Sequence, residues 1–330
     1  MLRLAAVLVL VAPAFMPVGG ASPETLSVCR LDYVEGANGP FLGLPPSDGQ
    51  ICVGAFAATA VSVGSHSTCV LLASGDVDCY GYSAYGQTQD RSEGDAVAVS
   101  AGAHYACILL RSGHVDCFGA WRQGASEDDV GGDAVAIDAA SNHTCVLTDA
   151  GNVRCWGHNH DGKSEPYQGG DAVAVSLGAS HTCALLASGN VDCWGSNRWG
   201  EGDDYLGGDA VAISAANAYT CILLRSGNVD CRGSGPYGQV GDYLGGDAIA
   251  VSAGGLHTCV LVASGRIHCY GAHDPAEDYA GSDAVAVSAG GGGTCVLLRW
   301  GSVECTGNRG GAYGQSQDYV GVVPAFGKTG

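Results

Sequence analysis

The stretch that decides the fold is GDAVAVSLGASHTCALLASGNVDCWG, which spans residues 170–195. It contains two cysteines ten positions apart, Cys183 and Cys193, and this pair recurs along the chain. The first cysteine of each pair stands at Cys69, Cys107, Cys145, Cys183, Cys221, Cys259 and Cys295. Self-similarity at a nearly fixed period of about 38 residues predicts a repeat architecture of seven units.

Each unit is predicted to consist of short β-strands. Residues 171–176 are rich in valine and alternate or run apolar, which suits a strand, and each cysteine marks a further strand. A tripeptide that ends in glycine separates the two cysteine strands, as in Ala187-Ser188-Gly189. It fits a three-residue hairpin loop, whose third position is left-handed and therefore favours glycine. We expect no helix after the N-terminal leader.

Units of this kind leave two architectures, a solenoid or a propeller. Solenoid coils are usually shorter than about 38 residues, whereas three or four short strands make one propeller blade. We therefore predict an all-β fold: a seven-bladed β-propeller built from repeats of about 38 residues and closed into a ring. We expect the ring to close between the tail at residues 318–323 and the opening strand near residues 60–63.

Composition limits the partners and the compartment. The chain has 330 residues, 16 cysteines and a formal net charge of −19. A surface this acidic repels phosphate, so we expect no nucleic acid and no anionic membrane as partner. So many cysteines indicate either disulfides in an oxidising compartment or bound metal.

The N-terminus favours the oxidising compartment. Residues 1–21 have a positive start, a short apolar run and a small-residue end, which is the pattern of a secretory signal peptide. A membrane anchor is the alternative, but the apolar run is too short to span a bilayer. We expect a protein secreted to an extracellular or periplasmic space, with no membrane association after cleavage. Its predicted parts are a looped N-terminal segment at 22–55, the propeller at 56–321 and a closing tail at 322–330.

The cysteine pairs are predicted to be disulfides across each hairpin. With Ser188 at the loop centre, Cys183 and Cys193 face each other at a non-hydrogen-bonded pair, where side chains approach most closely. Zinc is one alternative, but the spacing lacks two close ligand pairs; buried reduced thiols are another. The predicted bridges are Cys69–Cys79, Cys107–Cys117, Cys145–Cys155, Cys183–Cys193, Cys221–Cys231, Cys259–Cys269 and Cys295–Cys305, with Cys29–Cys52 pinning the N-terminal segment.

Two units carry a fuller set of marker residues. One combines His181-Thr182, Ala184-Leu185, Gly189, Val191, Trp194-Gly195, Asn197 and Gly200; another combines His143-Thr144, Leu147, Gly151, Val153, Trp156-Gly157, Asn159 and Gly162. Gln87, Gln239 and Gln315 end the pattern elsewhere. This pattern resembles the repeat of the regulator of chromosome condensation family over residues 56–321. Tyr105 and Tyr219 replace the histidine in two units.

The resemblance implies a seven-bladed propeller and a binding protein rather than an enzyme. The family's intracellular members act on nucleosomes and a small GTPase, which do not suit an acidic exported chain. The chain is more similar to exported bacterial propellers of this repeat, such as the propeller-type β-lactamase inhibitory protein.

Recurring histidines and acids are expected to be structural. The histidines His143, His181 and His257 share one repeat position, which indicates a hydrogen bond within each blade rather than catalysis or metal binding. The aspartates that precede a strand are predicted to bond their own backbone in turns; they are Asp95, Asp133, Asp171, Asp209, Asp247 and Asp283. The acidic clusters at 127–129 and 203–204 are predicted to be solvated loops, with weak calcium binding as the alternative. No catalytic motif, metal site or cofactor site is predicted.

Function is expected where the repeats differ. We call the stretch from each Cys-x-Gly to the next Gly-Asp a rim loop, and we expect consecutive rim loops on one rim of the ring. Aromatic and acidic residues there suit protein recognition, although packing between blades is the alternative. The Asp-Tyr tyrosines Tyr205, Tyr243, Tyr279 and Tyr319 are expected to be the more structural set. The predicted binding residues are Tyr82, Tyr85, Trp121, Arg122, His160, Trp199, Tyr237, His273 and Tyr313.

Three functions follow from these residues. The first is a monomeric protein-binding or inhibitor-like propeller without cofactor. The second is a polysaccharide-acting enzyme, which would need two carboxylates in one cleft. The third is a carbohydrate-binding propeller with one site in each blade, which the unequal aromatic residues argue against.

Overall fold

The computed structural model describes residues 57–119, 124–272, 278–291, 293–307 and 318–320, together with two short strands nearer the N-terminus. These strands are β1 (Val34–Gly36) and β2 (Gly39–Phe41), which pair antiparallel. The N-terminal segment was predicted to be a loop, so this small sheet corrects that expectation. The proposed leader at 1–21 and the Cys29–Cys52 pair lie outside the described residues.

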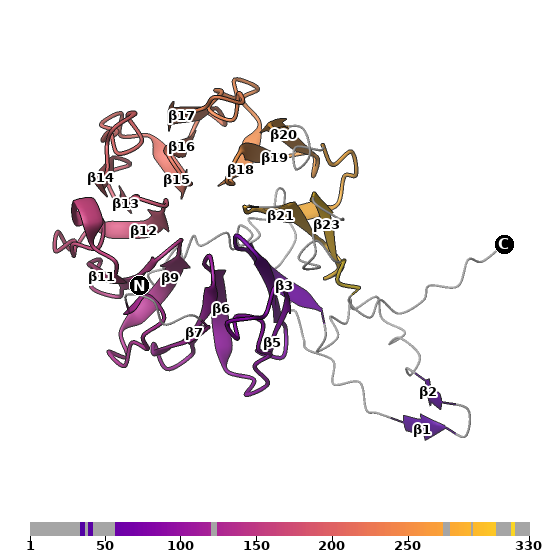
Figure 1. Cartoon of the computed structure of the whole chain (residues 1–330). Helices are drawn as coiled ribbons and strands as arrows, with labels where there is room; N and C mark the ends of the chain where they lie inside the picture. The colour runs from indigo at the N-terminus through magenta and orange to yellow at the C-terminus, as the bar shows by residue number, and fades with distance from the viewer. Residues whose placement is uncertain are drawn as a thin grey trace, which may run out of the picture.

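Seven three-stranded antiparallel sheets stand around a common axis (Figure 1). The inner strands are β3 (Ala58–Val63), β6 (Ala96–Ala101), β9 (Ala134–Ala139), β12 (Ala172–Leu177), β15 (Ala210–Ala215), β18 (Ala248–Ala253) and β21 (Ala284–Ala289). The middle strands are β4 (Ser67–Leu72), β7 (Tyr105–Leu110), β10 (His143–Thr148), β13 (His181–Leu186), β16 (Tyr219–Leu224), β19 (His257–Val262) and β22 (Gly293–Leu298). The outer strands are β5 (Val77–Gly81), β8 (Val115–Gly119), β11 (Val153–Gly157), β14 (Val191–Gly195), β17 (Val229–Gly233), β20 (Ile267–Gly271) and β23 (Val303–Gly307). The predicted seven-bladed all-β architecture is confirmed, and no α-helix occurs in the described parts of the chain.

The hairpin between middle and outer strands has the predicted register. In the fourth blade Gly189 occupies the third loop position with a φ of +81°, and its N–H donates to the Leu186 carbonyl at 2.9 Å. A Cβ atom on Gly189 would lie 2.4 Å from the Gly208 carbonyl oxygen. Both the backbone conformation and the available space therefore require glycine.

A disulfide crosses every one of these hairpins. Cys183 and Cys193 are direct cross-strand partners with a Cα–Cα distance of 4.1 Å. The other six predicted pairs are bonded in the same way, at Cα–Cα distances of 4.0 or 4.1 Å. Each bridge therefore joins two strands of one blade, and no described cysteine is left for zinc.

The core lies between blades rather than within them. In one cluster Ala174 and Leu185 of the fourth blade pack against Ile213 and Ile222 of the fifth. The inner strands contribute mostly alanine and valine, because adjacent sheets converge toward the axis and leave little room there. Each blade thus needs its neighbours to bury its faces.

The ring closes by packing of the seventh blade on the first. Val61 and Leu72 share a buried cluster with Leu297 and Val303, and the Ala58 N–H donates to the Gly301 carbonyl at 2.9 Å. Tyr319 pairs with Val303 in its own blade, and its ring packs on this same cluster. Within residues 318–320, the tail therefore contributes the Tyr319 side chain to the interface between the seventh and first blades, and it forms no strand pair with β3.

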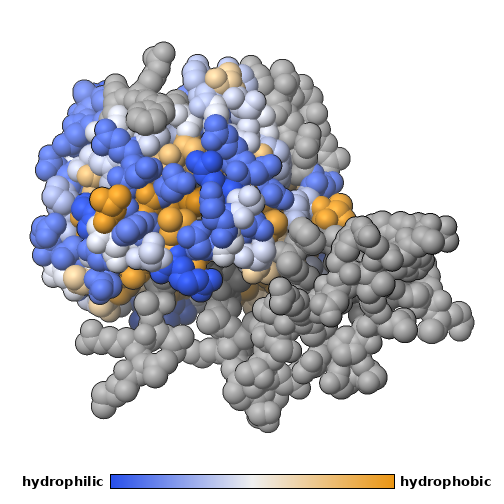
Figure 2. Space-filling model, turned by 90° about the horizontal axis from the view of Figure 1, so that it is seen from below, coloured by the Kyte–Doolittle hydropathy of each residue, from blue (hydrophilic) through white to orange (hydrophobic). Residues whose placement is uncertain are grey.

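The outside of the ring is mainly polar. Figure 2 shows one edge of the ring, on which hydrophobic residues form small separate groups among hydrophilic ones. A short 3₁₀ helix, η2 (His160–Gly162), follows β11, and no helix of the described residues is long and apolar enough to cross a membrane.

Candidate interaction face

The first part of each rim loop lies beside the turn between the inner and middle strands. Backbone hydrogen bonds fix this arrangement: the Tyr82 N–H donates to the His66 carbonyl at 2.9 Å, and the Ser196 N–H donates to the Ser180 carbonyl at 2.8 Å. All these turns lie at the same end of their blades. We call this side of the ring the loop face, and the opposite side, where the middle–outer hairpins turn, the hairpin face.

A buried polar side chain holds the tip of several rim loops. The Tyr85 N–H donates to Gln87 Oε1 and the Tyr237 N–H donates to Gln239 Oε1, both at 3.0 Å. In the fourth blade Glu201 takes the place of glutamine, and its carboxylate accepts the Trp199 N–H at 2.7 Å. Burial would raise the pKa of Glu201, but the hydrogen bonds from backbone N–H groups of its own loop and from the Ser196 hydroxyl lower it overall. The residue that ends the family-like pattern is therefore the internal support of the loop.

The supported tips present aromatic side chains to solvent. The exposed fractions are 46% for Tyr85, 66% for Trp199 and 58% for Tyr237. A glycine with positive φ follows each of them, at +79°, +85° and +80° for Gly86, Gly200 and Gly238. The backbone under each aromatic residue is thus fixed by a tight turn and a buried acceptor, while the side chain is exposed to solvent.

The third blade presents a different tip. Lys163 occupies the position of Gln87 and Gln239, but its ammonium donates to Asn142 Oδ1 and to the Ala179 carbonyl, which lie in the inner–middle turns of the third and fourth blades. Burial lowers the pKa of Lys163. Asp161 stands where the first, fourth and fifth blades have Tyr85, Trp199 and Tyr237, and it adopts a φ of +63°. The neighbouring His160 ring is exposed and stacks on His158 at 5.9 Å between centroids.

Four rings gather where the first and second blades meet. His66 stacks on His104 with a centroid distance of 5.2 Å, and Tyr85 approaches His104 edge-on at 5.0 Å. Tyr82 joins them, with its ring 5.8 Å from that of Tyr85. His66 and His104, which lie in the inner–middle turns, were not among the binding residues predicted from the sequence. The sequence difference that could have indicated them is a histidine at the repeat position where other units have Asn142 or Ser180.

The predicted binding residues therefore separate into three groups. Tyr82 and Tyr85 belong to one cluster, whereas His160, Trp199 and Tyr237 lie apart from it on three consecutive blades. Trp121, Arg122, His273 and Tyr313 lie outside the described residues.

The second part of each rim loop runs along the outer strand toward the hairpin face. Tyr205 forms a two-way backbone bridge with Val191, and its hydroxyl donates to Asp209. Tyr243 and Tyr279 do the same with Asp247 and Asp283, at 2.5 and 2.6 Å. These tyrosines have structural contacts, as expected. Asp209, Asp247 and Asp283 accept tyrosine hydroxyls, which the prediction of backbone bonds within the turns did not include, whereas Asp133 pairs with Arg154. The hydrogen bond to Asp247 raises the pKa of Tyr243 to about 12.

The recurring histidines bond between blades, not within them. His143 Nε2 lies 3.0 Å from Thr182 Oγ1 of the next blade, and His181 Nε2 lies 2.6 Å from Thr220 Oγ1. The prediction of a blade-internal bond was therefore wrong, because the ring points across the interface. Burial lowers the pKa of His143 to about 3 and that of His181 to about 4. These histidines are neutral and structural.

The acidic clusters also have structural partners. Asp128 accepts the Cys117 N–H at 2.9 Å, and Asp204 accepts the Cys193 N–H at 3.0 Å. Asp129 pairs with Arg154 of the next blade. Within the part of the chain that is described, no group of three His, Cys, Asp or Glu side chains could hold a metal ion.

Comparison with known proteins identifies the repeat. Residues 58–87, 134–163 and 172–201 match the model of the regulator of chromosome condensation (RCC1) repeat. Comparison with curated proteins finds no match.

Several solved structures share the fold. The ectodomain of the receptor kinase CR4 from Physcomitrella patens is 23% identical over 76% of this chain and 73% of that chain, with a TM-score of 0.64. The CRINKLY WD40 ectodomain of the receptor kinase ACR4 from Arabidopsis thaliana is 21% identical over 81% and 99%, also at 0.64. Prp20p from Saccharomyces cerevisiae, described with binding to Gsp1p and histones, is 15% identical over 77% and 84%, at 0.62. At these identities the likeness concerns the fold.

Proposed function

Because the chain carries RCC1 repeats and folds as the propeller of that family, we propose that it is an exported protein-binding module that uses its loop face. The proposal includes secretion after cleavage of residues 1–21, action as a monomer, and no catalytic activity of its own.

The observation that carries this proposal is the set of exposed aromatic tips. Tyr85, Trp199 and Tyr237 are among the most exposed large side chains of the loop face, yet each stands on a turn fixed by a buried hydrogen-bond acceptor. The fold does not need an aromatic residue there, since the third blade has Asp161. Rigid tyrosine and tryptophan side chains lose little entropy on binding and supply much of the energy of protein interfaces.

Export is supported by the seven disulfides. Disulfides persist in oxidising compartments and are rare in a reducing cytosol. Each bridge joins two strands of a single blade. The buried clusters lie between blades, so a blade has no core of its own and the bridge stabilises its hairpin. Two of the structurally similar proteins are receptor ectodomains.

The experiment compares the two faces of the ring. The protein is immobilised and exposed to the medium in which it is secreted, and the retained proteins are identified. The variants Trp199→Ala and Tyr237→Ala remove exposed rings from the loop face, whereas Trp300→Ala is the matched control, because Trp300 is 49% exposed on a hairpin of the opposite face.

We expect one partner to be retained by the wild type and by Trp300→Ala, and to bind about 10-fold to 100-fold more weakly to each loop-face variant. Equal retention by all three variants would place the interface elsewhere. Failure to retain any protein, together with turnover of a glycan, would replace the proposal by the polysaccharide-acting alternative.

A further inference from the structure

One position of the inner strand forms a closed ring of hydrogen bonds around the axis. The fifth residue of each inner strand accepts the N–H of the last residue of the next inner strand, at 2.8–3.0 Å. The ring closes where Ser288 accepts the Val63 N–H, across a sequence separation of 225. The seven accepting residues are Ser62, Ser100, Asp138, Ser176, Ser214, Ser252 and Ser288.

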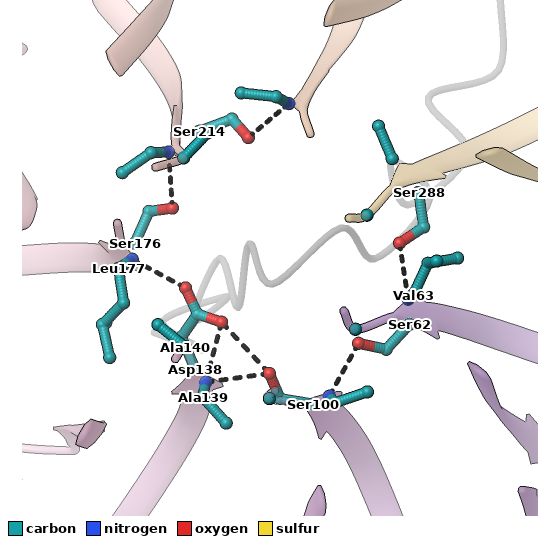
Figure 3. A pocket seen from close by; sticks show the side chains of 18 of the residues that line it. Ser62, Val63, Ser100, Asp138, Ala139, Ala140, Ser176, Leu177, Ser214 and Ser288 are labelled. Carbon is teal, nitrogen blue, oxygen red and sulfur yellow. Dashed lines mark hydrogen bonds between the residues drawn. The ribbon is translucent and has the colours of Figure 1, made fainter. Parts of the chain in front are cut away.

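These seven residues surround a central cavity of about 200 Å³. Figure 3 shows the Asp138 carboxylate and the hydroxyls of Ser62, Ser100, Ser176, Ser214 and Ser288 arranged in a circle on successive inner strands. Small residues such as Ala98, Ala139 and Gly178 line the cavity, which extends to the turn residues of the loop face. The cavity is therefore lined by small side chains, is partly apolar and reaches the face that carries the aromatic tips.

Asp138 is the one carboxylate in this ring. Its oxygens accept the Ser100 hydroxyl at 3.1 Å, the Ala139 N–H at 2.9 Å and the Leu177 N–H at 2.8 Å. All of these donors are uncharged, and none of the ion pairs among the described residues includes Asp138. The carboxylate is thus held in place by uncharged donors, and no cationic side chain of the described residues forms an ion pair with it.

The fold does not require a carboxylate at this position. Serine accepts the same backbone N–H in the six other blades, at almost the same distance. Enclosing a carboxylate among seven blades has a cost, since the loss of water raises the pKa of Asp138. A cation in the cavity would offset that cost.

We propose that the central cavity binds a primary ammonium group on an unbranched aliphatic chain, with Asp138 as its counter-ion. An ammonium group has three donors, which suit the Asp138 oxygens and the flanking hydroxyl oxygens of Ser100 and Ser176. The alanine and glycine residues of the wall can pack against the methylene groups of such a chain. The net charge of −19 draws cations to the ring. The ammonium belongs either to a free alkylamine or to a lysine side chain of a partner.

Binding of n-butylammonium chloride, measured by titration calorimetry at constant ionic strength and pH 7.5, tests the proposal. We expect saturable 1:1 binding to the wild type, at least 10-fold weaker binding to Asp138→Ser, and no comparable binding of the neutral analogue 1-butanol. Asp138→Ser is a matched variant, because it installs the residue of the other six blades. Asp138→Asn is the second variant, since it keeps the shape and removes only the charge.

Circular dichroism and the melting temperature of both variants check that the ring is intact. Equal affinity of butylammonium for the wild type and Asp138→Asn would overturn the proposal, as would equal binding of 1-butanol. A titration with Nα-acetyl-lysine methylamide distinguishes the two sources. If Nα-acetyl-lysine methylamide binds as tightly as butylammonium, the site is assigned to a lysine side chain. If butylammonium binds and Nα-acetyl-lysine methylamide does not, the site is assigned to a free amine. Because loop-face variants do not enter this test, its failure is separate from failure of the proposed function.

Discussion

We expect mild acid to destabilise this protein through His143, His181 and His257, and we expect their replacement by tyrosine to remove that effect. All three imidazoles are fully buried at interfaces between blades. Burial lowers the pKa of His143 to about 3 and those of His181 and His257 to about 4, from an ordinary value of 6.5. The Lys163 ammonium lowers the pKa of His143 further.

The hydrogen bonds explain why these rings resist protonation. Thr182 Oγ1 donates to the Lys163 carbonyl at 2.8 Å, so it accepts the Nε2–H of His143. Thr220 Oγ1 likewise donates to the Glu201 carbonyl at 2.9 Å and accepts the Nε2–H of His181. The proton therefore sits on Nε2, and a second proton would have to go on a buried Nδ1 that has no acceptor.

The sign and size follow from proton linkage. Above pH 6.5 both states hold neutral histidine, and the histidines make stability independent of pH. Below pH 6.5 the unfolded chain takes up protons that the folded ring does not, so stability falls as the pH falls. At pH 5 each histidine removes about 2 kcal/mol, and the three together remove about 6 kcal/mol. That is a large part of the usual stability of a folded domain.

The chain itself supplies the control substitution. Tyr105 occupies the same position in the second blade, where its hydroxyl donates to the His143 carbonyl at 2.7 Å. The triple variant His143→Tyr, His181→Tyr, His257→Tyr therefore uses a side chain that this interface already accepts. Carboxylates and net charge affect both proteins equally, so the difference between them isolates the histidines.

Denaturant unfolding with intact disulfides, at pH 7.5 and pH 5.0, measures the effect. The free energy of unfolding of the wild type should fall by about 6 kcal/mol more than that of the triple variant, and each single variant should recover about 2 kcal/mol. A difference below about 2 kcal/mol for the triple variant would refute the assignment of three buried neutral histidines.

Three further predictions concern the scaffold. Gly189→Ala should destabilise the protein more than Gly238→Ala in thermal unfolding, because both glycines have φ near +80° but only the Cβ at Gly189 meets a backbone oxygen, at 2.4 Å; equal losses would contradict the steric argument. Replacing Cys183 and Cys193 together by serine should lower the free energy of unfolding by about 2–3 kcal/mol, measured in denaturant, and an unchanged value would show that the bridge does not restrain the unfolded chain. Thiol titration of the denatured, unreduced protein should find no free thiol among the fourteen paired cysteines, and two or more reactive thiols from that set would contradict the bridges.

The local features of each blade could be predicted from the sequence. The glycine at the hairpin turn and the pairing of Cys183 with Cys193 depend on residues at most ten positions apart, whose relation a single hairpin defines. The repeat period can be read directly from the spacing of the cysteine pairs. The sequence also placed Trp199 and Tyr237 in the rim loops, where the repeats differ from one another, and both side chains are exposed in the structure.

The contacts between blades were decided only by the tertiary structure. The bond from His143 to Thr182 joins residues 39 positions apart, and the bond from Val63 to Ser288 joins residues 225 apart. Sequence placed His143 in a repeated structural role but assigned it the wrong partner, and it gave no reason to connect Asp138 with the serines of other blades. A repeat pattern fixes what lies within one unit, whereas side chains at the interfaces find their partners only when seven similar units are packed around one axis.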